Sequence, residues 1–94
     1  MPDLSGKSVW ITGAGSGIGE AIAKSLAAGG AHVALSARRE ETLRQVADDI
    51  AASGGKVEIY PLDISDSDKV FETVAKIKSA MGKIDVLINC AGVN

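Results

Sequence analysis

Apolar and polar positions along the chain follow two different periods. Apolar runs occupy Ser8 to Thr12, Val33 to Ala37 and Val86 to Ile88, and Val57 to Leu62 alternates apolar with polar residues. Short apolar runs are typical of parallel strands that are covered on both faces. Three stretches with helical spacing separate these runs. The sequence therefore predicts a βαβαβαβ order with short connections.

Each of the three stretches predicts an amphipathic helix. The first runs from Ile18 to about Ala28, and the spacing assigns these residues to its sheet-facing side: Ile18, Ala21, Ile22, Ser25, Leu26 and Gly29. The second carries a stripe made of Leu43, Val46, Ala47 and Ile50 and is expected to stop near Gly54-Gly55. The third is expected to begin at a capping box formed by Ser65 and Asp68 and to end at Gly82, with its stripe at Val70, Val74, Ile77 and Met81.

The connectivity predicts the order of the strands. Crossovers between parallel strands are almost always right-handed, which gives the order 3-2-1-4 in an α/β, Rossmann-like three-layer sandwich, half of a doubly wound domain. Pro61 assigns the third strand to an edge, because proline cannot donate to a sheet ladder. We expect residues 1–94 to form one dinucleotide-binding domain. Since the third helix alone would cover one face, we also expect that face and the apolar fourth strand to be exposed. The chain is then expected to self-associate through them or else to remain partly molten.

Composition excludes several classes of function. Ten basic and twelve acidic residues give a formal charge of −2, which gives no reason to expect nucleic acid or an anionic membrane as partner. The single His32 and single Cys90 exclude a zinc-type cluster, so no metal is expected; His32 is expected at the surface and Cys90 in the core. No run reaches the roughly 20 apolar residues of a membrane span. We therefore expect a soluble, cytoplasmic protein.

The glycine-rich segment after the first strand predicts a phosphate-binding turn. It contains Gly13, Gly15, Ser16, Gly17, Ile18 and Gly19, and it opens the first helix. Glycine permits positive φ and a close backbone approach to a pyrophosphate, while the first N–H groups of the helix face the anion. A turn of this kind is specific only between a strand and a helix, which is its context here.

The end of the second strand bears on the choice of nicotinamide cofactor. A carboxylate there accepts from the ribose 2′-hydroxyl of NAD, whereas arginine suits the 2′-phosphate of NADP. The sequence reads Ser36-Ala37-Arg38-Arg39, with no carboxylate before Glu40. Arg38 is thus the main candidate for the phosphate, with Arg39 secondary and Ser36 a minor donor. The alternative is that Arg38 is a solvated arginine paired with a nearby acid.

Four motifs together resemble the short-chain dehydrogenase/reductase family. Thr12-Gly13-x-x-x-Gly17-x-Gly19 is similar to its TGxxxGxG turn, and Leu4-Ser5-Gly6-Lys7 to its lead into the first strand. The other two matches are Asp63-Ile64, which stands where the family contacts adenine, and Asn89-Cys90-Ala91-Gly92, which resembles its NNAG segment. The resemblance implies cofactor contacts at Asp63, Ile64, Asn89, Ala91 and Gly92. Cys90 replaces an asparagine, so no side-chain role is assigned there.

The resemblance also implies a reaction. The family uses a Tyr-x-x-x-Lys pair and an upstream serine to move a proton while hydride passes between nicotinamide and a carbonyl or alcohol. The one tyrosine here, Tyr60, is followed four residues later by Ile64, so no catalytic residue is assigned. We expect an NADP(H)-dependent oxidoreductase acting on a small-molecule carbonyl or alcohol, with NAD(H) possible, whose dinucleotide-binding part alone is encoded here and is inactive by itself. The alternative is a non-catalytic nucleotide-binding or self-associating module. The expected protein partner is a second copy of the chain, in a homo-oligomer or through self-association of the fourth strand.

Overall fold

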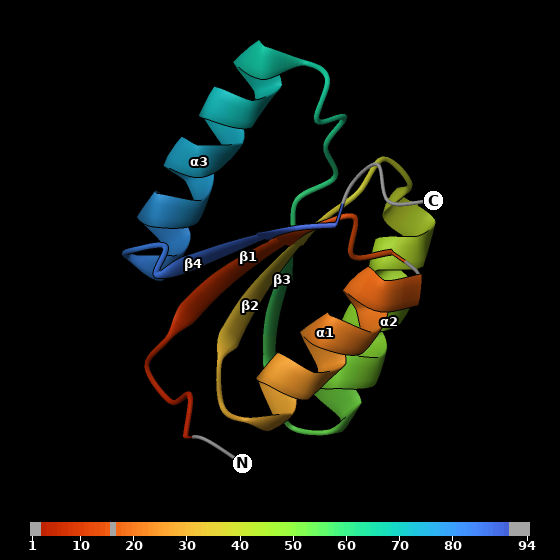
Figure 1. The fold of residues 1–94 in the computed structure, drawn as a ribbon, viewed down its shortest axis with the longest axis vertical. Helices are drawn as coiled ribbons and strands as arrows, with labels where there is room; N and C mark the ends of the chain where they lie inside the picture. The colour runs from red at the N-terminus through yellow and green to blue at the C-terminus, as the bar shows by residue number, and fades with distance from the viewer. Residues whose placement is uncertain (1–2, 16, 91–94) are drawn as a thin grey trace.

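The computed structural model describes residues 3–15 and 17–90. They form one parallel four-stranded sheet in the order β3-β2-β1-β4, as expected from the connectivity. Figure 1 shows α1 and α2 on one face of this sheet and α3 on the other. The elements in chain order are β1 (Ser8–Thr12), α1 (Gly17–Ala28), β2 (His32–Ser36), α2 (Glu40–Ala52), β3 (Lys56–Ile59), α3 (Ser67–Met81) and β4 (Val86–Asn89). The α/β sandwich predicted from the sequence is therefore confirmed.

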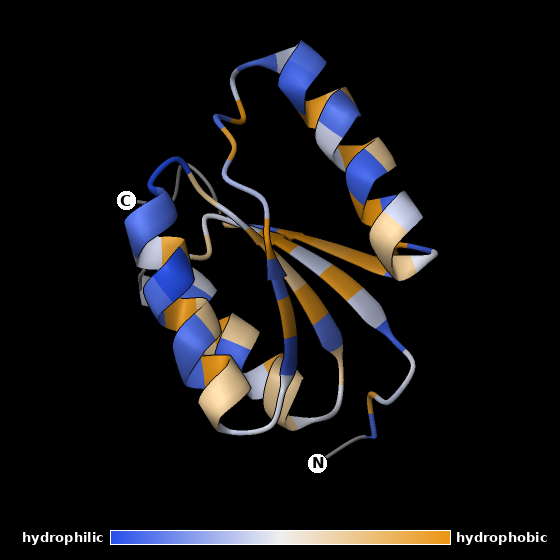
Figure 2. Cartoon of the chain, turned by 180° about the vertical axis from the view of Figure 1, so that it is seen from behind, coloured by the Kyte–Doolittle hydropathy of each residue, from blue (hydrophilic) through white to orange (hydrophobic). Residues whose placement is uncertain are grey.

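The main core lies between the sheet and the helices α1 and α2. Alternate residues of the strands, such as Ile11 and Leu35, pack there against Leu43 of α2, and all three side chains are fully buried. Figure 2 shows the apolar segments concentrated on the strands and on the inner sides of these helices. Burial of large aliphatic side chains contributes about 1.5–3 kcal/mol each, so this layer dominates the stability of the fold.

The buried face of α1 differs from the predicted stripe. Gly19, Ala23 and Ala27, spaced four residues apart, are buried, whereas Ile18 is 63% exposed and Ala21 faces solvent. Small residues along one face let a helix backbone approach a sheet closely. The helix is therefore rotated by about one residue from the orientation that hydrophobicity alone predicts, because close packing here favours small side chains over large apolar ones.

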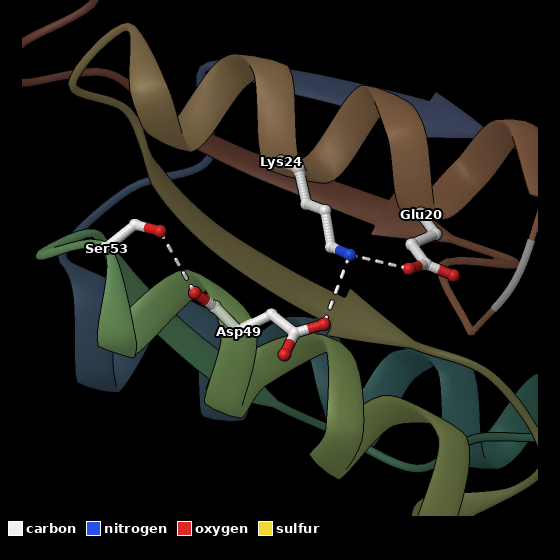
Figure 3. A network of polar contacts seen from close by, with 4 residues as sticks. All are labelled: Glu20, Lys24, Asp49 and Ser53. Carbon is white, nitrogen blue, oxygen red and sulfur yellow. Dashed lines mark hydrogen bonds and ion pairs between the residues drawn. The ribbon is translucent and has the colours of Figure 1, made fainter.

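A lysine ties α1 to α2 on the outside of the core. The ammonium group of Lys24 lies 2.7 Å from a carboxylate oxygen of Glu20 and 3.1 Å from one of Asp49 (Figure 3). The hydroxyl of Ser53 donates to the backbone carbonyl of Asp49 at 3.3 Å. The hydrogen bond from Lys24 to Glu20, and to a smaller extent the one to Asp49, raises the pKa of Lys24. Because the three charged groups are substantially exposed, the network orients the helices more than it stabilises them.

The second core layer lies under α3. Trp10 and Ala34 of the sheet pack against Leu62 and Ile77, and all four are buried. The expectation of an uncovered face is therefore corrected only for the two central strands, where Trp10 of β1 and Ala34 of β2 are buried under α3. Exposure is instead concentrated on β4, where Leu87 is 56% exposed.

The two edges of the sheet differ as predicted. Just after β3, the N–H groups of Tyr60 and Leu62 donate to the carbonyl groups of Leu35 and Ala37 at 2.8 and 2.9 Å. Pro61 stands between these two donors, at a position whose N–H would point away from β2, so its missing donor costs no ladder hydrogen bond. At β4, the strand pairs with β1, and no proline or charge interrupts the run from Val86 to Ile88.

The N-terminus of α3 uses a different cap from the one expected. Asp66 is the N-cap residue, and its carboxylate accepts from the backbone N–H of Lys69 at 3.2 Å. Ser65 instead donates its hydroxyl and its N–H to Asp63. Both Ser and Asp are good N-caps, so the local sequence offered two neighbouring choices, and the turn formed by Asp63 favours the second. Gly82 ends the helix with φ of 84°, as expected.

The surface position expected for His32 is only partly correct. Its Nε2 lies 3.0 Å from a carboxylate oxygen of Glu58 on the neighbouring strand, and its side chain is 29% exposed. The second oxygen of the same carboxylate accepts from the hydroxyl of Tyr60 at 2.9 Å. Partial burial, together with this hydrogen bond to Glu58, raises the pKa of Tyr60 to about 12. Strand pairing brings these residues together and fastens β3 to β2.

Candidate functional site

The carboxyl ends of the strands bring the predicted site residues to one edge of the sheet. Figure 1 shows the carboxyl ends of β1, β2 and β4 side by side near the N-terminal ends of α1 and α2. The glycine turn follows β1, Arg38 follows β2, and Asn89 ends β4. From β1 the chain adds β2 and β3 on one side of the sheet and then β4 on the other side, so the strand order reverses between β1 and β4. Ligands of open α/β sheets bind at such a reversal.

The glycines of the turn do different physical work. Gly13 and Gly17 have φ of 71° and 59°, a left-handed conformation that other residues rarely adopt. Gly19 has ordinary helical geometry, but a Cβ there would lie 2.0 Å from the carbonyl oxygen of Gly13. The first N–H groups of α1 have no partners within the helix and carry the positive end of its dipole. The turn thus folds tightly against the start of a helix suited to an anion.

Hydrogen bonds join the ends of β1 and β4. The hydroxyl of Thr12, which is 2% exposed, donates to the side-chain oxygen of Asn89 at 2.7 Å. The N–H of Cys90 donates to the carbonyl of Thr12 at 3.0 Å, and Cys90 is half-buried. The turn that opens after β1 is therefore fixed to the end of β4. Ser16, Ala91 and Gly92, which were also assigned to the site, lie outside the described residues.

Two exposed arginines follow β2. Arg38 lies in the connecting loop and Arg39 is the N-cap of α2, with no side-chain cap hydrogen bond. Within residues 3–15 and 17–90, neither guanidinium group forms an ion pair. Glu40, the next carboxylate along the chain, is bound by Arg44 one turn further along the helix. The loop thus presents positive charge while its nearest carboxylate in sequence is already paired.

Ser36 does not serve as a donor toward this loop. It is 1% exposed, and its hydroxyl oxygen accepts from the indole N–H of Trp10 at 2.9 Å. The expectation that it assists a phosphate is corrected, because the buried Trp10 needs a hydrogen-bond partner and Ser36 supplies it.

Asp63 lies after β3 and close enough to Arg38 for their charges to interact. Its carboxylate accepts from the hydroxyl of Ser65 at 2.7 Å and from the N–H of Ser65 at 3.0 Å. These bonds, with a smaller contribution from the charge of Arg38, hold the pKa of Asp63 below its ordinary value. Ile64, beside it, is 41% exposed. The carboxylate is therefore ionised near neutral pH, next to an accessible apolar side chain.

Two features are absent from the described residues. In ranges 3–15 and 17–90, no group of three or more His, Cys, Asp and Glu side chains is placed to hold a metal ion. Nor does this part of the chain contain a helix with the length and apolarity needed to cross a membrane. Two hollows in the surface lie along α2, from Glu40 to Asp48, and between α1 and α2, where Lys24 and Ser53 line the second one.

Comparison with known proteins identifies the family. Residues 7–94 match the short chain dehydrogenase family. The chain is 44% identical over 90 residues to the 2,3-dihydro-2,3-dihydroxybenzoate dehydrogenase of Bacillus subtilis. The matched region covers 96% of this chain and 34% of that enzyme. The chain thus spans about a third of the length of this relative.

Solved structures show the same fold. A metagenomic short-chain oxidoreductase in complex with NADP has a TM-score of 0.88 and 44% identity, covering 90% of this chain and 38% of that one. A Haemophilus influenza structure with bound NAD has a TM-score of 0.87 and 32% identity, covering 92% of this chain and 31% of that one. The sheet order, the glycine turn and the family match agree, and the chain belongs to the short-chain dehydrogenase/reductase family.

Proposed function

We propose that this chain supplies the dinucleotide-binding part of an NADP(H)-linked short-chain oxidoreductase in the cytoplasm. The substrate would be a small-molecule carbonyl or alcohol, since the bound nicotinamide supplies or accepts a hydride. Gly13, Gly15, Ser16, Gly17, Ile18 and Gly19 would hold the pyrophosphate, and Asp63 with Ile64 would contact the adenine. Asn89, Ala91 and Gly92 would line the cofactor from the end of β4.

The exposed arginines after β2 carry the choice of NADP(H) over NAD(H). Arg38 and Arg39 stand where a carboxylate would accept from a ribose 2′-hydroxyl, and Glu40 is bound to Arg44. The carboxylate of Asp63 lies within electrostatic reach of Arg38 and accepts hydrogen bonds from Ser65. A 2′-phosphate would find two exposed guanidinium groups here, neither of which forms an ion pair within residues 3–15 and 17–90. The relatives include structures with NADP and with NAD, so this choice rests on the residues of this chain.

Titration with NADPH and NADH tests this proposal, using the chain or a longer protein that contains it. Arg38→Asp should reverse a preference for NADPH, because a hydrogen bond to a charged group is worth about 1.5–3 kcal/mol, or roughly 10- to 150-fold in affinity. Lys76→Asp makes the same change of charge at an exposed position of α3, on the opposite face of the sheet, and is the matched control, expected to keep the preference. Equal affinities for the two cofactors in the parent protein would contradict the proposal.

We also propose that these 94 residues bind dinucleotide weakly and turn over no substrate. The family's Tyr-x-x-x-Lys pair does not occur in the sequence. Tyr60 is bound to Glu58, and its pKa is raised to about 12, whereas an acid–base group works best with a pKa near the operating pH. Carbonyl-dependent oxidation of NADPH by the purified chain would overturn this proposal. Binding without turnover in a longer protein that contains the chain would favour a non-catalytic nucleotide-binding module.

A further inference from the structure

Thr42, which no sequence motif singles out, connects the glycine turn to the loop that carries the arginines. It lies in the first turn of α2, and its hydroxyl donates to the backbone carbonyl of Arg39 at 3.0 Å. On its other side it faces Gly15. A Cβ added to Gly15 would lie 2.6 Å from the Thr42 Oγ1 and 3.3 Å from its Cβ. One half-buried side chain thus touches both phosphate-binding segments proposed above.

This contact explains why position 15 holds glycine. Gly15 is not among the described glycines with positive φ, so backbone conformation does not demand it. The space that a side chain would need is occupied by Thr42. Threonine is branched at Cβ and has few χ1 rotamers, so it yields less readily than a longer, flexible side chain. The distance between the turn and the start of α2 is therefore fixed by a packed contact.

We propose that Thr42 is a positioning residue for cofactor selectivity, an inference that rests on the proposed function. A dinucleotide with a 2′-phosphate presents two anionic groups at a fixed separation, one for the turn and one for the arginines. The hydroxyl of Thr42 donates to the Arg39 carbonyl, and the Thr42 side chain limits how closely α2 can approach Gly15. Its hydroxyl therefore favours NADPH more than NADH, because NADH lacks the group that the arginines would hold.

Paired substitutions test the role of the hydroxyl. Thr42→Val keeps the shape and removes the hydrogen bond, and it should weaken NADPH binding by about 2- to 10-fold, the range for one neutral hydrogen bond, with a smaller effect on NADH. Thr42→Ser keeps a hydroxyl and should retain the preference. Ser53→Ala removes a hydroxyl bonded to a carbonyl at the far end of α2 and is the control. A Thr42→Val protein with an unchanged ratio of NADPH to NADH affinity would overturn the inference.

A double-mutant cycle tests the contact with Gly15. Gly15→Ala alone should weaken NADPH binding, because its Cβ would collide with the Thr42 Oγ1. Gly15→Ala combined with Thr42→Ala removes that atom and should bind NADPH more tightly than Gly15→Ala alone. Simply additive losses would show that the two positions are not coupled and would contradict the inference.

The outcomes separate this inference from the proposed function. If the parent protein shows no preference for NADPH, the proposed function fails. If Arg38→Asp removes the preference but Thr42→Val leaves it intact, only the role of Thr42 fails. Urea unfolding measures the stability of each variant. A variant that is merely less stable should lose affinity for NADPH and NADH alike, whereas a change in selectivity alters the ratio of the two affinities.

Discussion

Gly19 packs directly against the backbone of Gly13, so that a side-chain carbon at Gly19 would lie 2.0 Å from the carbonyl oxygen of Gly13. Both partners are backbone, and neither can rotate away as a side chain could. The start of α1 can therefore lie this close to the end of β1 only because Gly19 has no Cβ. This relationship gives the glycine turn its shape whether or not a ligand is present.

Gly19→Ala is expected to destabilise the fold more than Gly17→Ala. Overpacking costs typically about 1–3 kcal/mol, and the fixed backbone puts Gly19→Ala at or above the upper end of that range. Gly17 has φ of 59° but open space around a Cβ, so Gly17→Ala should cost only the left-handed conformation, about 1–2 kcal/mol. Urea unfolding of the two variants measures the difference. Equal losses would show that α1 shifts to accommodate the methyl group.

Ser36→Ala should destabilise the fold even though it removes only one oxygen atom. The indole N–H of Trp10 would lose its partner inside the core, and a buried unsatisfied donor costs about 1–3 kcal/mol. In the Trp10→Phe background, the same substitution should cost clearly less, because no donor is left unpaired. Chemical denaturation of the four proteins gives this comparison. A loss of the same size in both backgrounds would contradict the assigned role of the hydrogen bond.

Asp85 is expected to make stability depend on acid pH. Its carboxylate accepts from the N–H of Ser8 at 2.8 Å and lies 3.0 Å from the ammonium group of Lys83, and these two interactions lower its pKa. A group whose pKa is lower in the folded state stabilises the fold above its unfolded pKa, and this contribution disappears as the pH falls through the folded value.

The difference in unfolding free energy between the parent and Asp85→Asn should therefore be constant above about pH 5 and shrink in more acidic solution. Asp48→Asn, on the outer surface of α2, is the control and should show no comparable trend. A difference that grows with acidity would have the wrong sign for this explanation.

The β4 edge is expected to cause self-association of the 94-residue chain. Val86 and Leu87 are 45% and 56% exposed, and the strand carries no proline or charge before Asn89. Leu87→Lys should weaken association by tenfold or more, since burial of one such side chain is worth about 1.5–3 kcal/mol. Phe71→Lys changes an equally apolar side chain on α3, which is 75% exposed, and is the control. Sedimentation at micromolar concentration checks this, and a monomeric parent would refute it.

The sequence by itself determined the elements and their order. Periodicity and glycine spacing located the strands and helices, because they report on local geometry that any packing must respect. Right-handed crossovers then gave the order β3-β2-β1-β4, and Pro61 assigned β3 to an edge. Four motifs together, the TGxxxGxG spacing among them, indicated the family to which the chain belongs.

Only the tertiary structure decided which side chains meet. Hydrophobicity directed Ile18 and Ala21 of α1 to the core, yet close approach to the sheet selected the small face of Gly19, Ala23 and Ala27. The indole N–H of Trp10 donates to Ser36, a residue 26 positions away that the sequence had suggested as a minor donor to the cofactor phosphate. These outcomes depend on distances between segments far apart in the chain. Sequence patterns constrain each segment, whereas close packing among the segments decides which of their atoms occupy the shared space.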